Sequence, residues 1–137
     1  MIEQSLWVLD TNTLVSRLLV PDGGAAQAVD HALERGILLL SEETSGELVE
    51  VLDRPKFNPY LTAEDQRRFL ALLGGVARVV PITRRSQACR DPKDDKFLDV
   101  ALCGQARAII TGDQDLLALD PFHDIRIVRT ATFLTWP

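Results

Sequence analysis

A run of four apolar residues leads directly into an aspartate near the N-terminus, at residues 6–12 (LWVLDTN). A short apolar run without polar alternation is typical of a strand that is buried on both faces, as parallel strands covered by helices are. Asp10, at the carboxyl end of this strand, would lie where open α/β sheets bind their ligands, in the crevice beyond the strand ends. This stretch therefore predicts an α/β fold with a site at one edge of a parallel sheet.

The rest of the chain alternates apolar runs with helical patterns. Four further strands are predicted, at residues 37–40, 76–81, 108–111 and 125–128. Helices are predicted at residues 12–20, 25–34, 41–54, 62–73, 94–105 and 116–119, with a short helical segment at 130–136 and a loop at 83–93. This alternation implies an α/β fold with three α/β/α layers around a five-stranded parallel sheet.

Length and composition fit one globular domain. The chain has 137 residues, of which 46% are hydrophobic, and no apolar run approaches the ~20 residues that span a membrane. The N-terminus lacks the basic region of a signal peptide, so we expect a single domain over residues 1–137 in the cytoplasm, with no membrane partner. In that reducing compartment Cys89 and Cys103 are expected to be free thiols.

Acidic residues recur at equivalent places in the predicted fold. Asp10 ends the first strand, Asp113 follows the fourth, Asp95 opens the helix before the fourth, and Glu47 lies about one turn into the helix after the second. Right-handed crossovers bring all these places to one edge of a parallel sheet. Carboxylates gathered there repel one another, and an oxygen-only ligand set suits Mg²⁺ or Mn²⁺.

Two polar neighbours of these acids have a predicted supporting role. Asn12 and Thr111 could orient a ligand or an attacking water by hydrogen bonding. Divalent cations bound to such acids act on phosphodiesters, because they lower the pKa of a bound water and stabilise the leaving oxygen.

The motifs around these acids, in this order, resemble those of PIN domains. They are residues 8–12 (VLDTN), 45–48 (SGEL), 91–98 (DPKDDKFL) and 110–116 (ITGDQDL), and the likeness covers essentially the whole chain. More narrowly, the chain is similar to the small PIN proteins that are toxin components of bacterial toxin–antitoxin pairs. The resemblance implies a metal-dependent endoribonuclease that is commonly dimeric and is held inactive by a cognate antitoxin.

The family's acids carry onto Asp10, Glu47, Asp95 and Asp113, and Asp115 matches a frequent extra acid. Asp95 is preferred as the third acid because it stands three residues before the leucine of the family pattern. The neighbouring acids leave a shift by one position open, and these are Asp91, Asp94 and Asp99. Asp99 lies one helical turn after Asp95 and could share its face.

Each acid also has a structural interpretation. Asp10, Asp94 or Asp95 could merely cap a helix, Asp113 could be a turn residue, and Glu47 could lie on an exposed helix face. One such coincidence is ordinary, whereas several at one sheet edge are not, so the group as a whole favours a site.

Basic residues could form a phosphate-binding rim around the acids. The candidates for binding the RNA substrate are Arg54, Lys56 and Arg85, with Arg84 and Arg90 beside them. A solvated surface explains them equally well. The net charge of −5 argues against a nucleic-acid-binding protein, although bound metal would cancel part of it locally.

Other functions fit the sequence less well. A phosphatase with Asp10 as its nucleophile commonly has a second acid two residues on, where this chain has Asn12. A receiver-type signalling domain has a phosphoacceptor aspartate in mid-chain and a late lysine, and neither is found. The remaining alternative is a catalytically silent PIN-like module that binds protein or RNA, although the presence of all four acids favours activity.

Overall fold

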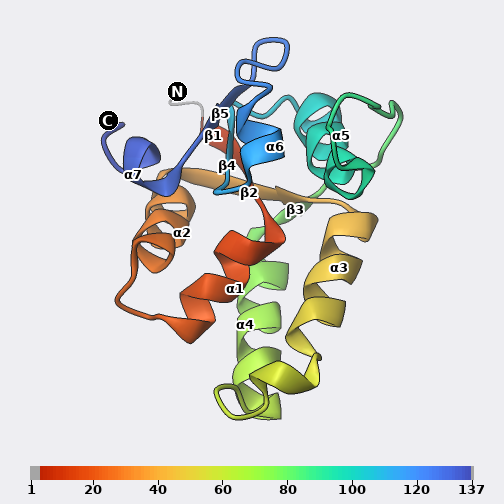
Figure 1. The fold of residues 1–137 in the computed structure, drawn as a ribbon. Coiled ribbons are helices and arrows are strands. Elements are labelled where there is room, and N and C mark those ends of the chain that lie inside the picture. Colours follow the sequence, from red (N-terminus) through yellow and green to blue (C-terminus); the bar gives the residue numbers. More distant parts are fainter. Residues whose placement is uncertain (1–3, 137) are drawn as a thin grey trace.

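Residues 4–136, which the computed structural model describes, form a parallel sheet between two layers of helices (Figure 1). The strand order is β3-β2-β1-β4-β5, so the first strand lies in the middle. The strands are β1 (Ser5–Leu9), β2 (Gly36–Leu40), β3 (Arg78–Val79), β4 (Ala108–Ile110) and β5 (Arg126–Val128). The predicted five-stranded parallel sheet with helices on both faces is confirmed.

The helices follow the strands in the expected alternation. They are α1 (Thr11–Leu19), α2 (Gly24–Arg35), α3 (Glu42–Leu52), α4 (Ala63–Val76), α5 (Asp95–Gly104), α6 (Gln114–Leu117) and α7 (Thr130–Phe133), with 3₁₀ turns η1 (Pro55–Phe57) and η2 (Pro92–Asp94). In the described part of the chain, none of these helices has the length and apolar character needed to cross a membrane. The two cysteines are free, as predicted.

The side chains of the central strands alternate between two hydrophobic clusters. Trp7 and Leu9 pack into the cluster formed with α1 to α4 and α7, whereas Val8 packs into the cluster formed with α5 and α6. In Figure 1, α1 to α4 extend below the sheet and α5 and α6 lie above it. Because both faces are covered, the central strands are apolar at every position.

Two helix starts were predicted correctly from their capping residues. The hydroxyl of Ser41 accepts a hydrogen bond from the Thr44 amide at 3.1 Å, and the Thr62 hydroxyl accepts one from the Asp65 amide at 3.0 Å. In both cases the later residue bonds back to the amide of the cap, which completes a capping box. The first of these caps fixes the start of α3, which carries Glu47.

The boundaries of α4, β3 and α6 differ from the prediction. Helix α4 continues through Gly74 and Gly75 to Val76, so β3 is confined to two exposed residues rather than spanning residues 76–81. Glycine costs a helix only ~1 kcal/mol, which the packed face of α4 offsets. Helix α6 spans Gln114–Leu117 rather than residues 116–119, because the side chain of Asp113 caps it.

Gly36 is required by close packing between β1 and β2. A Cβ atom at this position would lie 2.0 Å from the Ser5 carbonyl oxygen and 2.7 Å from the Trp7 indole nitrogen. We expect Gly36→Ala to reduce the free energy of unfolding by at least about 2 kcal/mol, because backbone must move. Urea denaturation measures this change.

Gly74→Ala is the matched control, since a Cβ there meets nothing within 4 Å and the residue is helical. This variant should gain roughly 0.5–1 kcal/mol. Equal stability of the Gly36→Ala variant and the unmodified protein would show that the two strands can separate without cost.

Candidate active site

The carboxyl ends of the two central strands place Asp10 and Thr111 side by side. Leu9 of β1 pairs with Ile110 of β4, and the next residue of each strand is buried. The Thr111 hydroxyl donates to Oδ2 of Asp10 at 2.5 Å and accepts a hydrogen bond from the Asp113 amide at 2.9 Å. Thr111 therefore links Asp10 to Asp113 through its one hydroxyl.

Asp10 is both a helix cap and part of this cluster. Its Oδ1 accepts a hydrogen bond from the Thr13 amide at 2.9 Å, which caps α1, while its Oδ2 bonds to Thr111. Burial raises the pKa of Asp10, and the hydrogen bonds from Thr111 and Thr13 oppose that rise. The capping and site interpretations of this residue are thus compatible.

Asp113 is fixed in the same way at the start of α6. Its Oδ1 accepts hydrogen bonds from the amides of Asp115 at 2.8 Å and of Leu116 at 3.1 Å. Asp115 thus supports Asp113 through its backbone amide. Its carboxylate does not line the cleft that contains Asp113.

Asp94 is the third acid that the structure brings to this edge. It lies at the end of η2, immediately before α5, and lines the same cleft as Asp113. Burial raises the pKa of Asp94 to about 7, and the negative charges of Asp113, Asp91 and Asp10 add to the rise. The fold thus concentrates negative charge where a cation could offset it.

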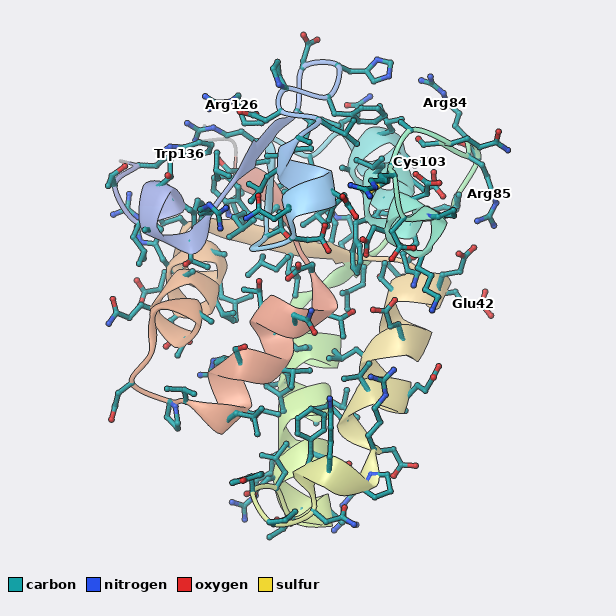
Figure 2. All side chains as sticks on the ribbon, in the orientation of Figure 1. Glu42, Arg84, Arg85, Cys103, Arg126 and Trp136 are labelled. Atoms are coloured by element: carbon teal, nitrogen blue, oxygen red, sulfur yellow. The ribbon has the colours of Figure 1, made fainter. Side chains whose placement is uncertain are left out.

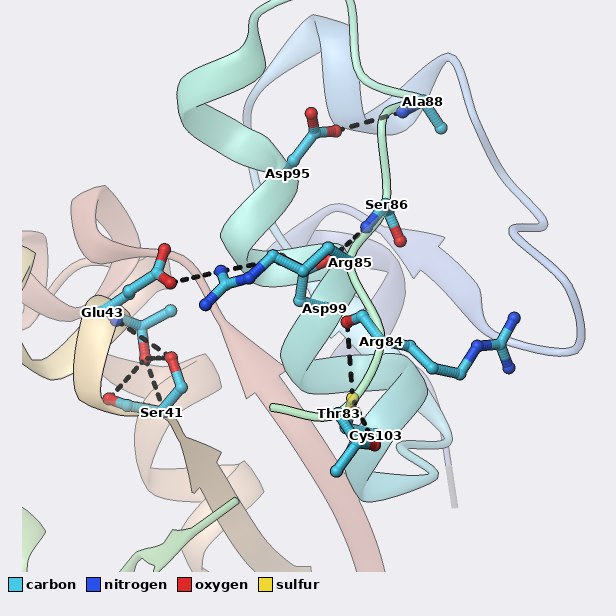
Figure 3. A network of polar contacts seen from close by, with 11 residues as sticks. Ser41, Glu43, Thr83, Arg84, Arg85, Ser86, Ala88, Asp95, Asp99 and Cys103 are labelled. Carbon is cyan, nitrogen blue, oxygen red and sulfur yellow. Dashed lines mark hydrogen bonds and ion pairs between the residues drawn. The ribbon is translucent and has the colours of Figure 1, made fainter. Parts of the chain in front are cut away.

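Asp95, the acid preferred from the sequence, faces the other way. Its Oδ1 accepts hydrogen bonds from the amides of Ala88 at 3.3 Å and Cys89 at 2.9 Å (Figure 3). Asp99 does share its face, but this buried side chain accepts from the Ser86 amide at 2.6 Å. Asp94 therefore lines the cleft that contains Asp113, whereas Asp95 and Asp99 line a neighbouring one, because successive residues of a helix point about 100° apart.

Two of these aspartates, Asp94 and Asp113, line an open cleft of about 760 Å³. Six acids and three bases line it, together with Asn12 and Gly46: Glu43, Glu47, Glu50, Asp91, Asp94, Asp113, Arg54, Lys93 and Lys96. Glu47 enters the cleft from α3, where its carboxylate is ion-paired with Lys96 of α5. Asn12 and Glu47 thus line the same cleft as Asp113.

The three predicted RNA-binding residues are dispersed. Arg54 lines the acidic cleft, whereas Lys56 lies over the ring of Phe57, 5.1 Å from its centroid, and is not among the residues lining the cleft. Arg85 projects from the outer side of the loop beside α5, as Arg84 does (Figure 2). Arg85 forms an ion pair with Glu43, toward which it points in Figure 3. It also lines a neighbouring cleft of about 540 Å³.

Sequence reasoning missed the two lysines of the cleft, Lys93 and Lys96. Both belong to the acidic motif at residues 91–98, and this position was the one sequence feature that could have placed them near the acids. That signal is weak, because lysines next to acids are common on solvated surfaces.

The donor set fits a hard divalent cation. Carboxylate oxygens are the ligands that Mg²⁺ and Mn²⁺ prefer, and carboxylates outnumber bases among the residues that line the cleft. Within residues 4–136, however, no three His, Cys, Asp or Glu side chains stand close enough together to enclose one ion. Glu47 is held by Lys96, so its carboxylate would have to exchange partners to join a metal.

Comparison with known proteins places this arrangement in a family. The PIN domain model matches residues 7–115. The uncharacterised protein MJ1680 of Methanocaldococcus jannaschii is 32% identical over 117 residues, which cover 82% of this chain and 73% of that protein.

Two solved structures share the fold at lower identity. VapBC2 from Rickettsia felis, solved bound to a DNA fragment from their promoter, has a TM-score of 0.60 and 11% identity, covering 90% of this chain and 98% of that chain. PAE2754 from Pyrobaculum aerophilum has a TM-score of 0.62 and 16% identity, covering 95% and 87%.

The raised pKa of Asp94 predicts a pH dependence of stability. An unfolded aspartate titrates near pH 3.9, whereas folded Asp94 titrates near 7, so the folded state binds more protons between these values. The contribution of this group to the free energy of unfolding therefore falls as pH rises from about 4 to about 7. Asp94→Asn, which lacks the titration, should gain stability relative to the unmodified protein across this window.

Thermal unfolding in EDTA between pH 4.5 and 8 measures this difference. Melting temperatures of the two proteins that run parallel with pH would contradict the proximity of Asp94 to the other carboxylates.

Proposed function

Because the chain belongs to the PIN domain family, we propose that it is a divalent-metal-dependent endoribonuclease. The observation that supports this most directly is that Asp94, Asp113 and Glu47 line one cleft, with buried Asp10 linked to Asp113 through Thr111 at the carboxyl edge of the two central strands. Ligands of open α/β sheets bind at this edge. The resemblance of the motifs to PIN toxins points to RNA as the substrate.

Four carboxylates would hold the cation, which we propose is Mg²⁺ or Mn²⁺. They are Asp10, Glu47, Asp94 and Asp113, with Asp94 in place of Asp95. When bound, such a cation lowers the pKa of a coordinated water and stabilises developing charge on a phosphodiester. The buried position of Asp10 and the fixed amides at Asp113 preorganise the ligands, so little rearrangement is needed on that side.

Other residues of the cleft would handle the RNA strand. Arg54 and Lys93 line the cleft and can contact phosphates without reading sequence. Asn12, exposed at the start of α1, can donate a hydrogen bond to a phosphate oxygen or to water. Thr111 is a positioning residue, since it holds Asp10 and the Asp113 amide without reaching the cleft surface.

The charge of the cleft makes RNA binding depend on metal. Six acids outnumber three bases among the lining residues, so the metal-free cleft repels a polyanion. A bound divalent cation reverses part of this field at the point where the phosphate must lie. This dependence reconciles the net charge of −5 with a nucleic-acid substrate.

A partner protein is the second part of the proposal. We infer that the chain is the toxin of a toxin–antitoxin pair, bound by a cognate antitoxin and forming a homodimer. The motif resemblance supports this role, and so does the shared fold with a structure described as VapBC2.

We expect substitutions of Asp94 and of the adjacent Asp95 to affect the rate of RNA cleavage differently. With a mixed RNA pool and Mg²⁺ or Mn²⁺, Asp94→Asn and Asp10→Asn should lose roughly 10³-fold in cleavage rate, because charge stabilisation of several kcal/mol is removed. Asp95→Asn is the matched control: the same change at the next position should leave cleavage within roughly threefold. Gel-resolved cleavage rates, with an EDTA control, provide the measurement.

Metal-independent cleavage, or full activity of Asp10→Asn, would overturn the proposed site. Loss of activity in Asp95→Asn with retention in Asp94→Asn would return the third position to Asp95. Absence of cleavage by folded protein free of any partner would favour the silent binding module.

The toxin role has its own expected outcome. Induced expression of the chain in a bacterial host should arrest growth, whereas Asp113→Asn expressed to the same level should not, because its metal site is incomplete. Growth curves with matched protein levels on immunoblots test this. Equal growth of both cultures, with a nuclease that is active after purification, would separate the enzyme from a toxin role.

A further inference from the structure

Lys96 occupies an unusual position within the acidic cleft. It lies in the first turn of α5, two residues after Asp94, and its ammonium group forms an ion pair with Oε2 of Glu47 on α3. The side chains of Lys96 and Glu47 are only 19% and 27% exposed. Partial burial weakens screening by water and salt, so this pair is stronger than a typical surface ion pair.

The other two bases of the cleft are held differently. The side chains of Lys93 and Arg54 form no ion pair within the described part of the chain, and both residues are exposed. Among the acids that we propose as metal ligands, Glu47 alone has a cationic side chain of residues 4–136 bonded to it. The ion pair therefore affects one ligand of the proposed site selectively.

Glu47 cannot serve Lys96 and a metal ion equally well. The two cations compete for the same carboxylate, and residues 4–136 contain no ready cluster of three ligands while the Lys96 pair is formed. We propose that Lys96 is an internal competitor for Glu47, which weakens the affinity of the cleft for a divalent cation and so sets the concentration at which the site fills. This inference rests on the proposed function, because it assumes that the cleft binds such a cation.

Mn²⁺ binding, measured by calorimetry and by the loss of the free-ion EPR signal, tests this without any activity assay. Lys96→Gln should bind Mn²⁺ roughly tenfold more tightly than the unmodified protein, because Glu47 is released. Lys93→Gln is the matched control, since it removes the same charge from the same cleft without releasing a carboxylate. Its affinity should rise by less than roughly threefold.

A double-mutant cycle shows whether the effect passes through Glu47. Glu47→Gln should lower the affinity, and adding Lys96→Gln to it should then produce no more gain than Lys93→Gln does. Thermal unfolding of each variant in EDTA confirms that it is folded, and Lys96→Arg, which can retain the pair, should bind Mn²⁺ as the unmodified protein does.

The outcomes separate this inference from the function on which it rests. Equal gains from Lys96→Gln and Lys93→Gln, or a gain that persists in the Glu47→Gln background, would overturn the competition while leaving the metal site intact. Failure of both the unmodified protein and Lys96→Gln to bind Mn²⁺ would overturn the metal site and the competition together. Loss of binding in Asp113→Asn identifies the site as the one described.

Discussion

The hydrogen bond from the Thr111 hydroxyl to Asp10 joins the ends of the two central strands, and the geometry of the site depends on it. The hydroxyl has one proton to donate, and giving it to Asp10 leaves an oxygen lone pair for the Asp113 amide. One buried side chain thereby fixes two of the proposed ligands. Since Asp10 caps α1 and Asp113 caps α6, the first turns of both helices are held in register with the sheet edge.

The acids at this edge of the sheet have different hydrogen-bonding partners, and these partners determine what each acid can do. Asp95 and Asp99 are satisfied by backbone amides of the preceding loop, so they order the chain that leads into α5. Burial, together with the negative charge of nearby Asp113, raises the pKa of Asp94 to about 7. The same short segment therefore supplies both the acids that order this loop and an acid that lines the cleft. Lys96, in the first turn of α5, adds a third role, because its ammonium group forms an ion pair with Glu47 of α3.

Much of the fold could be predicted because its signals are local. Apolar runs bounded by turn residues identified the strands, and Ser41 and Thr62 identified helix starts through hydrogen bonds that span three residues. The predictions were less accurate where local preference and packing disagree. Gly74 and Gly75 usually end a helix, yet α4 passes through them, because the buried contacts of its other face outweigh the propensity cost.

The sequence by itself determined which strands carry acids at their ends and that these ends share one edge, since a parallel sheet with right-handed crossovers permits no other arrangement. It could not determine which of two adjacent aspartates faces the cleft. The 3₁₀ turn at Pro92–Asp94 sets the rotation of α5, and one residue changes the direction of a side chain by about 100°. The pairing of Lys96 with Glu47 was equally beyond the sequence, because it joins residues 49 positions apart whose approach depends on the packing of α3 against α5.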